Sequence, residues 1–337
     1  MKRIVLPILF AAVLSAAESG MTPALNSFTT SCYQQLAGSD GNLILSPFNI
    51  ATALSMALVG ARGQSAEEIE SVLHVHYDSA YDAAFGSLLA KLVTTGNTGG
   101  NQLRTANGLW AQKGFAIHAA FQNTLAKDYQ APLTLLDFIS NPEASRTQIN
   151  RWTEQHTKEK IMNLLPAGSI KSDTRLVLTS AIYFYGKWKD AFVSSRTQPA
   201  PFSLSTGATI QTSFMNQTSH FAYTEAPSAQ ILEINYAGTG IAFEVLLPKA
   251  LTGLPDLEKI INLGKPRQLV WQPDQSEGTG KPPEVPCRIG ILPSQSALDH
   301  GHARTFHRPG GLLWYRPEPQ DLSGHPQGFR RCIRTGY

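Results

Sequence analysis

The chain has 337 residues, of which 42% are hydrophobic and 16% charged, so it can bury a sizeable core and is not a collagen, a coiled coil or a wholly disordered protein. The 28 Lys and Arg residues exceed the 25 Asp and Glu residues by a net charge of only +3, which excludes the strongly basic surface typical of nucleic-acid binders. Three cysteines are too few for a disulfide scaffold.

The N-terminus has the layout of a secretory signal peptide. Lys2 and Arg3 precede an apolar run over Ile4–Leu14, and three small residues ending at Ala17 come before Glu18. The apolar run is shorter than the roughly 20 residues that span a bilayer. We therefore expect residues 1–17 to be removed and the protein to be secreted, extracellular or periplasmic; a buried N-terminal helix is the alternative.

Helix signals dominate the next part of the chain. A short apolar strand over residues 42–45 is expected to meet Ser46, which with the following proline predicts the N-cap of a helix over residues 47–58. The Ser65 and Glu68 pair has the spacing of a capping box and predicts the start of a second helix. Asn141 followed by proline predicts a third helix, with apolar residues at helical spacing.

Strand signals follow in the second half. The run Leu176–Phe184 is almost continuously apolar, as expected for a strand covered on both faces, and Ile241–Leu247 is a second such run. Shorter strand candidates cover residues 202–204, 221–223 and 231–236. Helices first and strands later predict an α+β fold rather than alternating βαβ units.

Motifs for enzymatic chemistry are missing from the sequence. It contains no GxSxG elbow, P-loop, GxGxxG, HExxH or CxxC pair, so we expect no enzyme, no cofactor and no small-molecule substrate. His74 and His76 have a two-residue spacing but no third ligand nearby, and a solvated helix end explains them better than a metal site. His300, His302 and His307 lie in a segment of unusual composition, discussed below.

Two long motifs give the chain a family resemblance. NLILSPFNIATALSMALVGARGQSAEEI over residues 42–69 resembles the helix and turn of the serpin family, and INRWTEQHTKEKIMNLLPAGSIKSDTRLVLTSAIYFYGKW over residues 149–188 resembles the most diagnostic stretch of that family. The similarity covers about residues 25–264. It implies helices packed around large mixed β-sheets, termed A, B and C, and an exposed reactive loop near the C-terminus.

The resemblance also implies a mechanism and its control residues. A target serine protease cleaves the loop and is trapped as an acyl-enzyme while the loop inserts into sheet A, driven by strain stored in the native state. Ser46 matches the serine beneath the sheet in the shutter, and Trp188 matches the tryptophan of the breach, where insertion begins. Ser180 departs from the family, which has Asn there; one hydroxyl replaces an amide with two donors and an acceptor.

The composition changes near Pro266. Residues 266–337 hold 10 of the 21 prolines, 4 of the 9 histidines and two of the three cysteines, and they lack periodic patterning. With permitted codons, Gly311–Tyr337 can be read one base later as a serpin-like segment that leads into the reactive loop. We therefore hypothesise a frameshift near residues 263–266, real or a sequencing error, which makes Cys287, Cys332 and the histidines of this segment out-of-frame residues.

These observations predict a signal peptide over residues 1–17, a partial serpin domain over 18–264, incomplete at its C-terminus, and an irregular tail over 265–337. By ancestry the protein is a serpin that inhibits a serine protease, and less plausibly a cysteine protease. The alternative is a non-inhibitory or non-functional remnant with at most a binding role. For the chain as written we expect no protease partner, no nucleic-acid partner and no membrane association.

Overall fold

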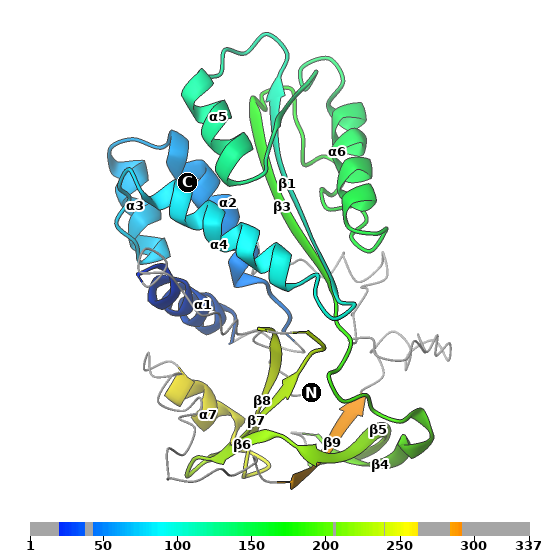
Figure 1. Ribbon diagram of the computed structural model, residues 1–337. Coiled ribbons are helices and arrows are strands. Elements are labelled where there is room, and N and C mark those ends of the chain that lie inside the picture. The colour runs from blue at the N-terminus through cyan, green and yellow to red at the C-terminus, as the bar shows by residue number, and fades with distance from the viewer. Residues whose placement is uncertain (1–19, 38–42, 205–206, 239, 262–283, 292–337) are drawn as a thin grey trace.

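A computed structural model describes residues 20–37, 43–204, 207–238, 240–261 and 284–291 of the chain (Figure 1). The predicted signal peptide and most of the predicted tail lie outside these ranges. The described part contains helices and three separate β-sheets, which confirms the α+β prediction. No helix in these ranges is both long and apolar enough to cross a membrane.

Helices dominate the first half of the chain and strands the second. The helices are α1 (Met21–Ala37), α2 (Pro47–Gly60), α3 (Gln64–Leu73), α4 (Tyr81–Thr95), α5 (Ala119–Asp128), α6 (Pro142–His156) and α7 (Leu254–Ile261), with a 3-10 turn over Ser194–Arg196. The strands are β1 (Gln102–Gln112), β2 (Leu133–Leu136), β3 (Leu176–Tyr185), β4 (Gln198–Ser203), β5 (Thr209–His220), β6 (Ala222–Glu225), β7 (Ala229–Asn235), β8 (Ala242–Pro248) and β9 (Glu284–Ile291).

The longest strand pairing joins β1 to β3 in a sheet of order β2-β1-β3, where β2 runs parallel and β3 antiparallel to β1. Helices cover both faces of this sheet, with α6 on one side and α2, α4 and α5 on the other (Figure 1). Leu178 of β3 packs with Met56 of α2, whereas its neighbour Val177 packs in the cluster that holds Trp152 of α6. The apolar run of β3 therefore faces helices on both sides, as predicted.

Two smaller sheets lie beyond the end of β3. One has the order β4-β5-β9 and the other the order β6-β7-β8, and all their pairings are antiparallel. Figure 1 shows them at the end of the molecule where the chain leaves β3. The three short strand candidates correspond to β4, β6 and β7, and the second apolar run to β8.

The expectation of an irregular tail from residue 265 is wrong for one segment. Residues Glu284–Ile291 form β9, whose backbone pairs with β5 over its whole length. Pro286 is tolerated because β9 is an edge strand of its sheet, where one row of backbone N–H groups is not needed for the ladder. The rest of the tail, with its histidines and Cys332, lies outside the described residues.

Two local predictions also fail. Of the strand expected over residues 42–45, the described residues 43–45 form no strand, because none of the described strands pairs with them. Ser65 is not an N-cap: α3 begins at Gln64 after Gly63, so Ser65 already has helical backbone, and Glu68 Oε1 accepts a hydrogen bond from Gln64 Nε2 at 2.8 Å instead. The N-cap positions of Ser46 and Asn141 are confirmed, each with proline next.

Candidate functional site

The residues that the family resemblance singles out lie along β3 and the helix behind it. Ser46 begins α2, and its carbonyl oxygen accepts hydrogen bonds from the backbone N–H groups of Asn49 (3.1 Å) and Ile50 (3.2 Å). Its hydroxyl makes no capping hydrogen bond, and no other described residue bonds to it. The half-buried Ser46 thus starts the helix through its backbone.

Ser180 lies in the centre of β3, directly opposite Asn107 of β1. Because paired residues point to the same face of a sheet, both side chains face α2. Asn107 is 3% exposed, and its Nδ2 donates to the backbone oxygen of Tyr129 at 2.9 Å, just after α5. The neighbouring strand therefore places a buried amide directly opposite Ser180. Sequence reasoning did not identify Asn107, which precedes a glycine in a dipeptide typical of turns.

The opposite face of the sheet carries a second cross-strand contact. Trp110 Nε1 donates to Thr179 Oγ1 at 3.0 Å, and both residues are buried. The adjacent Gly108 leaves room for this bond, since a Cβ there would lie 2.7 Å from Trp110 Nε1. The Trp110 ring also meets Trp152 of α6 edge-on, with ring centroids 5.2 Å apart. These contacts fix α6 onto the pair of strands that contains Ser180.

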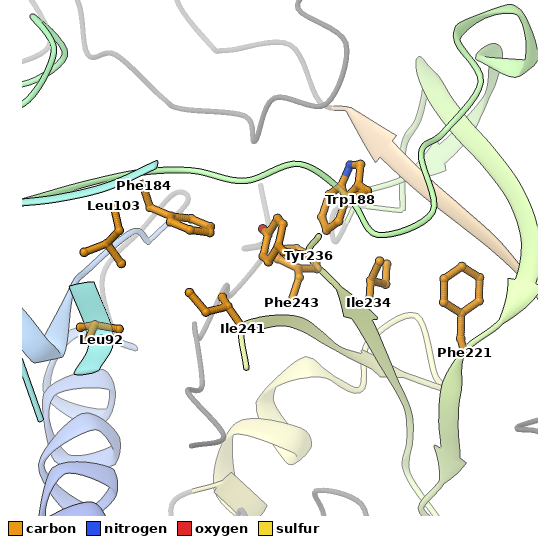
Figure 2. Close-up of a cluster of buried hydrophobic side chains, with 9 residues drawn as sticks. All are labelled: Leu92, Leu103, Phe184, Trp188, Phe221, Ile234, Tyr236, Ile241 and Phe243. Atoms are coloured by element: carbon orange, nitrogen blue, oxygen red, sulfur yellow. The ribbon is translucent and has the colours of Figure 1, made fainter. Parts of the chain in front are cut away.

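Trp188 follows the end of β3 and lies in an aromatic cluster (Figure 2). Its ring stacks on Tyr236 with centroids 4.7 Å apart and an interplanar angle of 8°, and it meets Phe243 edge-on at 5.8 Å. On its other side, Tyr236 meets Phe184 of β3 at 5.1 Å. Gly186 makes this packing possible, because a Cβ there would lie 2.4 Å from the Tyr236 ring. The stack joins β3 to the β7–β8 hairpin.

Asn101, at the start of β1, reinforces the same junction with hydrogen bonds. Its Nδ2 donates to the oxygen of Ala237 at 2.5 Å, and its Oδ1 accepts from the N–H of Lys187 at 2.8 Å. The N–H of Ala237 in turn donates to the oxygen of Lys187 at 2.6 Å. Asn101 is 5% exposed, so these bonds are shielded from water. One buried amide therefore connects β1, β3 and the hairpin.

The far edge of β3 is the part of the site that can bind another strand. Within the described ranges, β3 pairs with β1 along one edge and with no strand along the other. An open edge offers a row of backbone N–H and C=O groups that can bind an added strand. The cluster around Trp188 lies at one end of β3, and Ser180 lies at the middle of the strand.

His74 and His76, the described histidines considered as metal ligands, do not form a metal site. His74 Nε2 lies 3.1 Å from Ser31 Oγ, and His76 Nδ1 lies 3.6 Å from Glu70 Oε2. In the described part of the chain, no group of three or more His, Cys, Asp or Glu side chains could hold a metal ion. His74 ends α3 in a left-handed conformation, as a helix-terminal residue.

A pair of substitutions at Tyr236 tests how this cluster is stabilised. The ring is 2% exposed, but its hydroxyl has no hydrogen-bond partner among the described residues, and burial raises the pKa of Tyr236. We expect Tyr236→Phe to leave the free energy of unfolding unchanged or to raise it by up to about 1 kcal/mol. Tyr236→Ala removes the stacked ring and should lower it by about 3–5 kcal/mol. Urea denaturation measures both, and a loss above about 1 kcal/mol for Tyr236→Phe would contradict this account.

Comparison with known proteins gives a consistent result. The family model described as serpin (serine protease inhibitor) matches residues 23–278. An uncharacterized serpin-like protein of Thermococcus kodakarensis is 35% identical over 69% of this chain and 54% of its own length. Human serpin B3 is 34% identical over 73% of this chain and 68% of its own. The chain thus spans between about half and two-thirds of the length of such relatives.

Solved structures show the same similarity. The structure of emu ovalbumin matches with a TM-score of 0.73 at 25% identity, over 81% of this chain and 73% of that protein. Serpin48 of the insect Tenebrio molitor matches with a TM-score of 0.67 at 31% identity, over 77% of this chain and 70% of that protein. With a family match over most of its residues, the chain belongs to the serpin family.

Proposed function

We propose that this serpin descends from an inhibitor of serine proteases that acts by inserting its cleaved reactive loop into the sheet beside β3. The open edge of β3 carries this proposal. It lies between two helix-covered faces and ends at the cluster that contains Trp188. Members of the family are mostly protease inhibitors rather than enzymes, in agreement with the expected lack of enzymatic activity.

The described residues support particular steps of this mechanism. An inserted strand forms backbone hydrogen bonds with β3, each contributing about 0.5–1.5 kcal/mol net, so complete insertion can drive a large movement. Insertion begins beside Trp188, whose stack on Tyr236 holds the end of β3 in place. We assign Ser46 and Ser180 to the control of sheet opening on the α2 face, with Asn107 providing the amide next to Ser180.

The names of relatives support an inhibitory ancestor without identifying a target. A protein of Xenopus tropicalis that is 35% identical over 67% of this chain is named leukocyte elastase inhibitor. The match covers 61% of that protein, and the residue that selects a protease belongs to the reactive loop. We therefore propose a serine protease as the ancestral partner and leave the protease itself open.

We propose that a frameshift near residues 263–266 has replaced the reactive loop of the family. The family match ends at residue 278, inside the segment of changed composition. A serpin without this loop cannot present a scissile bond, so we expect the chain as printed not to trap a protease. The second candidate is a non-inhibitory or non-functional remnant with at most a binding role; β9 favours it only in that part of this segment pairs with β5 of the serpin body.

Two expressed proteins test these proposals together. Residues 18–337 as printed are compared with a version in which a single-base change near codons 263–266 restores a longer serpin frame. Both are incubated with trypsin-like, chymotrypsin-like and subtilisin-like proteases and analysed by SDS gel electrophoresis. We expect an SDS-resistant complex with the restored chain only, and none when the protease nucleophile has been inactivated.

Other results of this experiment, or of genomic sequencing, would contradict one of the proposals. A resistant complex formed by the printed chain would show that it contains a working loop. Failure of the restored chain with every protease would refute the inhibitory proposal and favour the remnant. Genomic sequencing that finds no single-base change able to restore a serpin frame would refute the frameshift.

We further propose that the protein is exported. The charged start, apolar run and small residues before Glu18 support this, although residues 1–19 lie outside the described part. N-terminal sequencing of protein recovered from the medium or periplasm should find a chain that begins near Glu18. Retention of Met1 in a cytoplasmic fraction would contradict export.

A further inference from the structure

A buried carboxyl group on β8 has no role in the mechanism described above. Glu244 is 6% exposed, and its Oε2 has no hydrogen-bond partner among the described residues. A carboxylate in such a place loses hydration without compensation, so its charged form is strongly disfavoured. The position therefore favours a protonated carboxyl group.

The residue opposite Glu244 makes its ionisation less favourable still. Glu233 of β7 is its direct cross-strand partner, and paired side chains in an antiparallel ladder point to the same face. Two carboxylates facing each other in this way repel, whereas protonation of one of them removes the repulsion. Desolvation first and the charge of Glu233 second raise the pKa of Glu244 to about 7.

Charged groups on the surrounding elements are engaged elsewhere. On α7, which packs on β8, Lys259 pairs with Asp256 at 3.0 Å and Glu258 Oε1 accepts a hydrogen bond from Tyr33 at 2.7 Å. At the far end of the sheet, Glu225 of β6 pairs with Lys249 at 2.6 Å. Within the described part, no cation is thus placed to neutralise Glu244.

The carboxyl pair lies next to the aromatic cluster in the ladder. The adjacent rung of the β7–β8 pairing is Ile234 opposite Phe243, and these two side chains point to the other face of the sheet. Both belong to the cluster around Trp188, and Phe243 meets the Trp188 ring at 5.8 Å (Figure 2). Repulsion at the Glu233–Glu244 rung therefore acts directly on the strands that support Trp188.

We propose that Glu244, buried directly opposite Glu233, is held in its protonated form and makes the β7–β8 hairpin, and with it the packing around Trp188, sensitive to pH. The hairpin is most stable while Glu244 carries its proton. Loss of that proton places two negative charges on facing strands, one of them buried. The hairpin then loosens at the junction with β3.

The direction of the pH dependence follows from proton binding. An unfolded glutamate releases its proton near pH 4.5, whereas Glu244 in the folded chain holds its proton to about pH 7. Between these values the folded state binds a proton that the unfolded state lacks, so stability falls as the pH rises. Above this window both states are deprotonated and the contribution of Glu244 has been lost.

Glu244→Gln is the informative variant, since glutamine resembles the protonated side chain in shape and charge. Urea midpoints of the full chain and of this variant are compared from pH 5 to pH 8.5, so that the titration of histidines cancels. We expect similar midpoints near pH 5 and a lower midpoint for the unsubstituted chain above pH 8. Glu233→Gln should move the fall to lower pH, and Glu67→Gln on the exposed face of α3 should leave the profile unchanged.

Amide hydrogen exchange at the same pH values tests the connection to the cluster. Protection of the β7 and β8 amides, corrected for intrinsic rates, should decrease between pH 5 and pH 8 and should not decrease in Glu244→Gln. If unfolding is irreversible, the rate of thermal aggregation replaces the urea midpoint in the same comparison.

Three results would overturn the proposal. Parallel pH profiles for the unsubstituted chain and Glu244→Gln would exclude Glu244 as the titrating group. An unchanged protection pattern in the hairpin would exclude its effect on the cluster. Recovery of the midpoint at pH 8 on addition of Mg²⁺ or Ca²⁺, in the unsubstituted chain but not in Glu244→Gln, would mean that a bound cation rather than a proton neutralises Glu244.

Discussion

The stack of Trp188 on Tyr236 is the contact on which the rest of the arrangement depends. It fixes the point where the chain leaves β3 against the β7–β8 hairpin, and the two buried hydrogen bonds of Asn101 close the same junction with β1. The aromatic rings bury a large apolar area, and the hydrogen bonds of the buried Asn101 amide fix the orientation of the segments that meet there. One end of the long β1–β3 pair is therefore held in place, and this fixes the position of the outer edge of β3.

The polar residues of the sheet are explained by the same geometry. Asn107 and Ser180 lie opposite each other on the α2 face, where the Asn107 amide donates to the oxygen of Tyr129. On the α6 face, the Trp110 indole donates to Thr179. Each face of the β1–β3 pair therefore has a buried polar contact.

The sequence predicted helices and strands most accurately where the signal lies within a few neighbouring residues. Proline after Ser46 and after Asn141 located α2 and α6, and unbroken apolar runs located β3 and β8. It failed where distant segments decide the outcome. Residues 43–45 lack a partner strand, β9 forms because β5 offers its edge, and the bond from Asn101 to Ala237 joins positions 136 residues apart. Trp188 was identified through the family resemblance, but its stacking partner depends on the packing of two sheets.

Amide hydrogen exchange along β3 tests the central claim that its outer edge is open in the printed chain. In an antiparallel pair, successive residues direct their N–H groups alternately to the partner strand and to the opposite edge. The account therefore predicts alternating strong and weak protection over Leu176–Tyr185, with the alternation replaced by uniform protection when a strand is inserted. Uniform strong protection in the printed chain would contradict the account, because a further strand would then already occupy the edge.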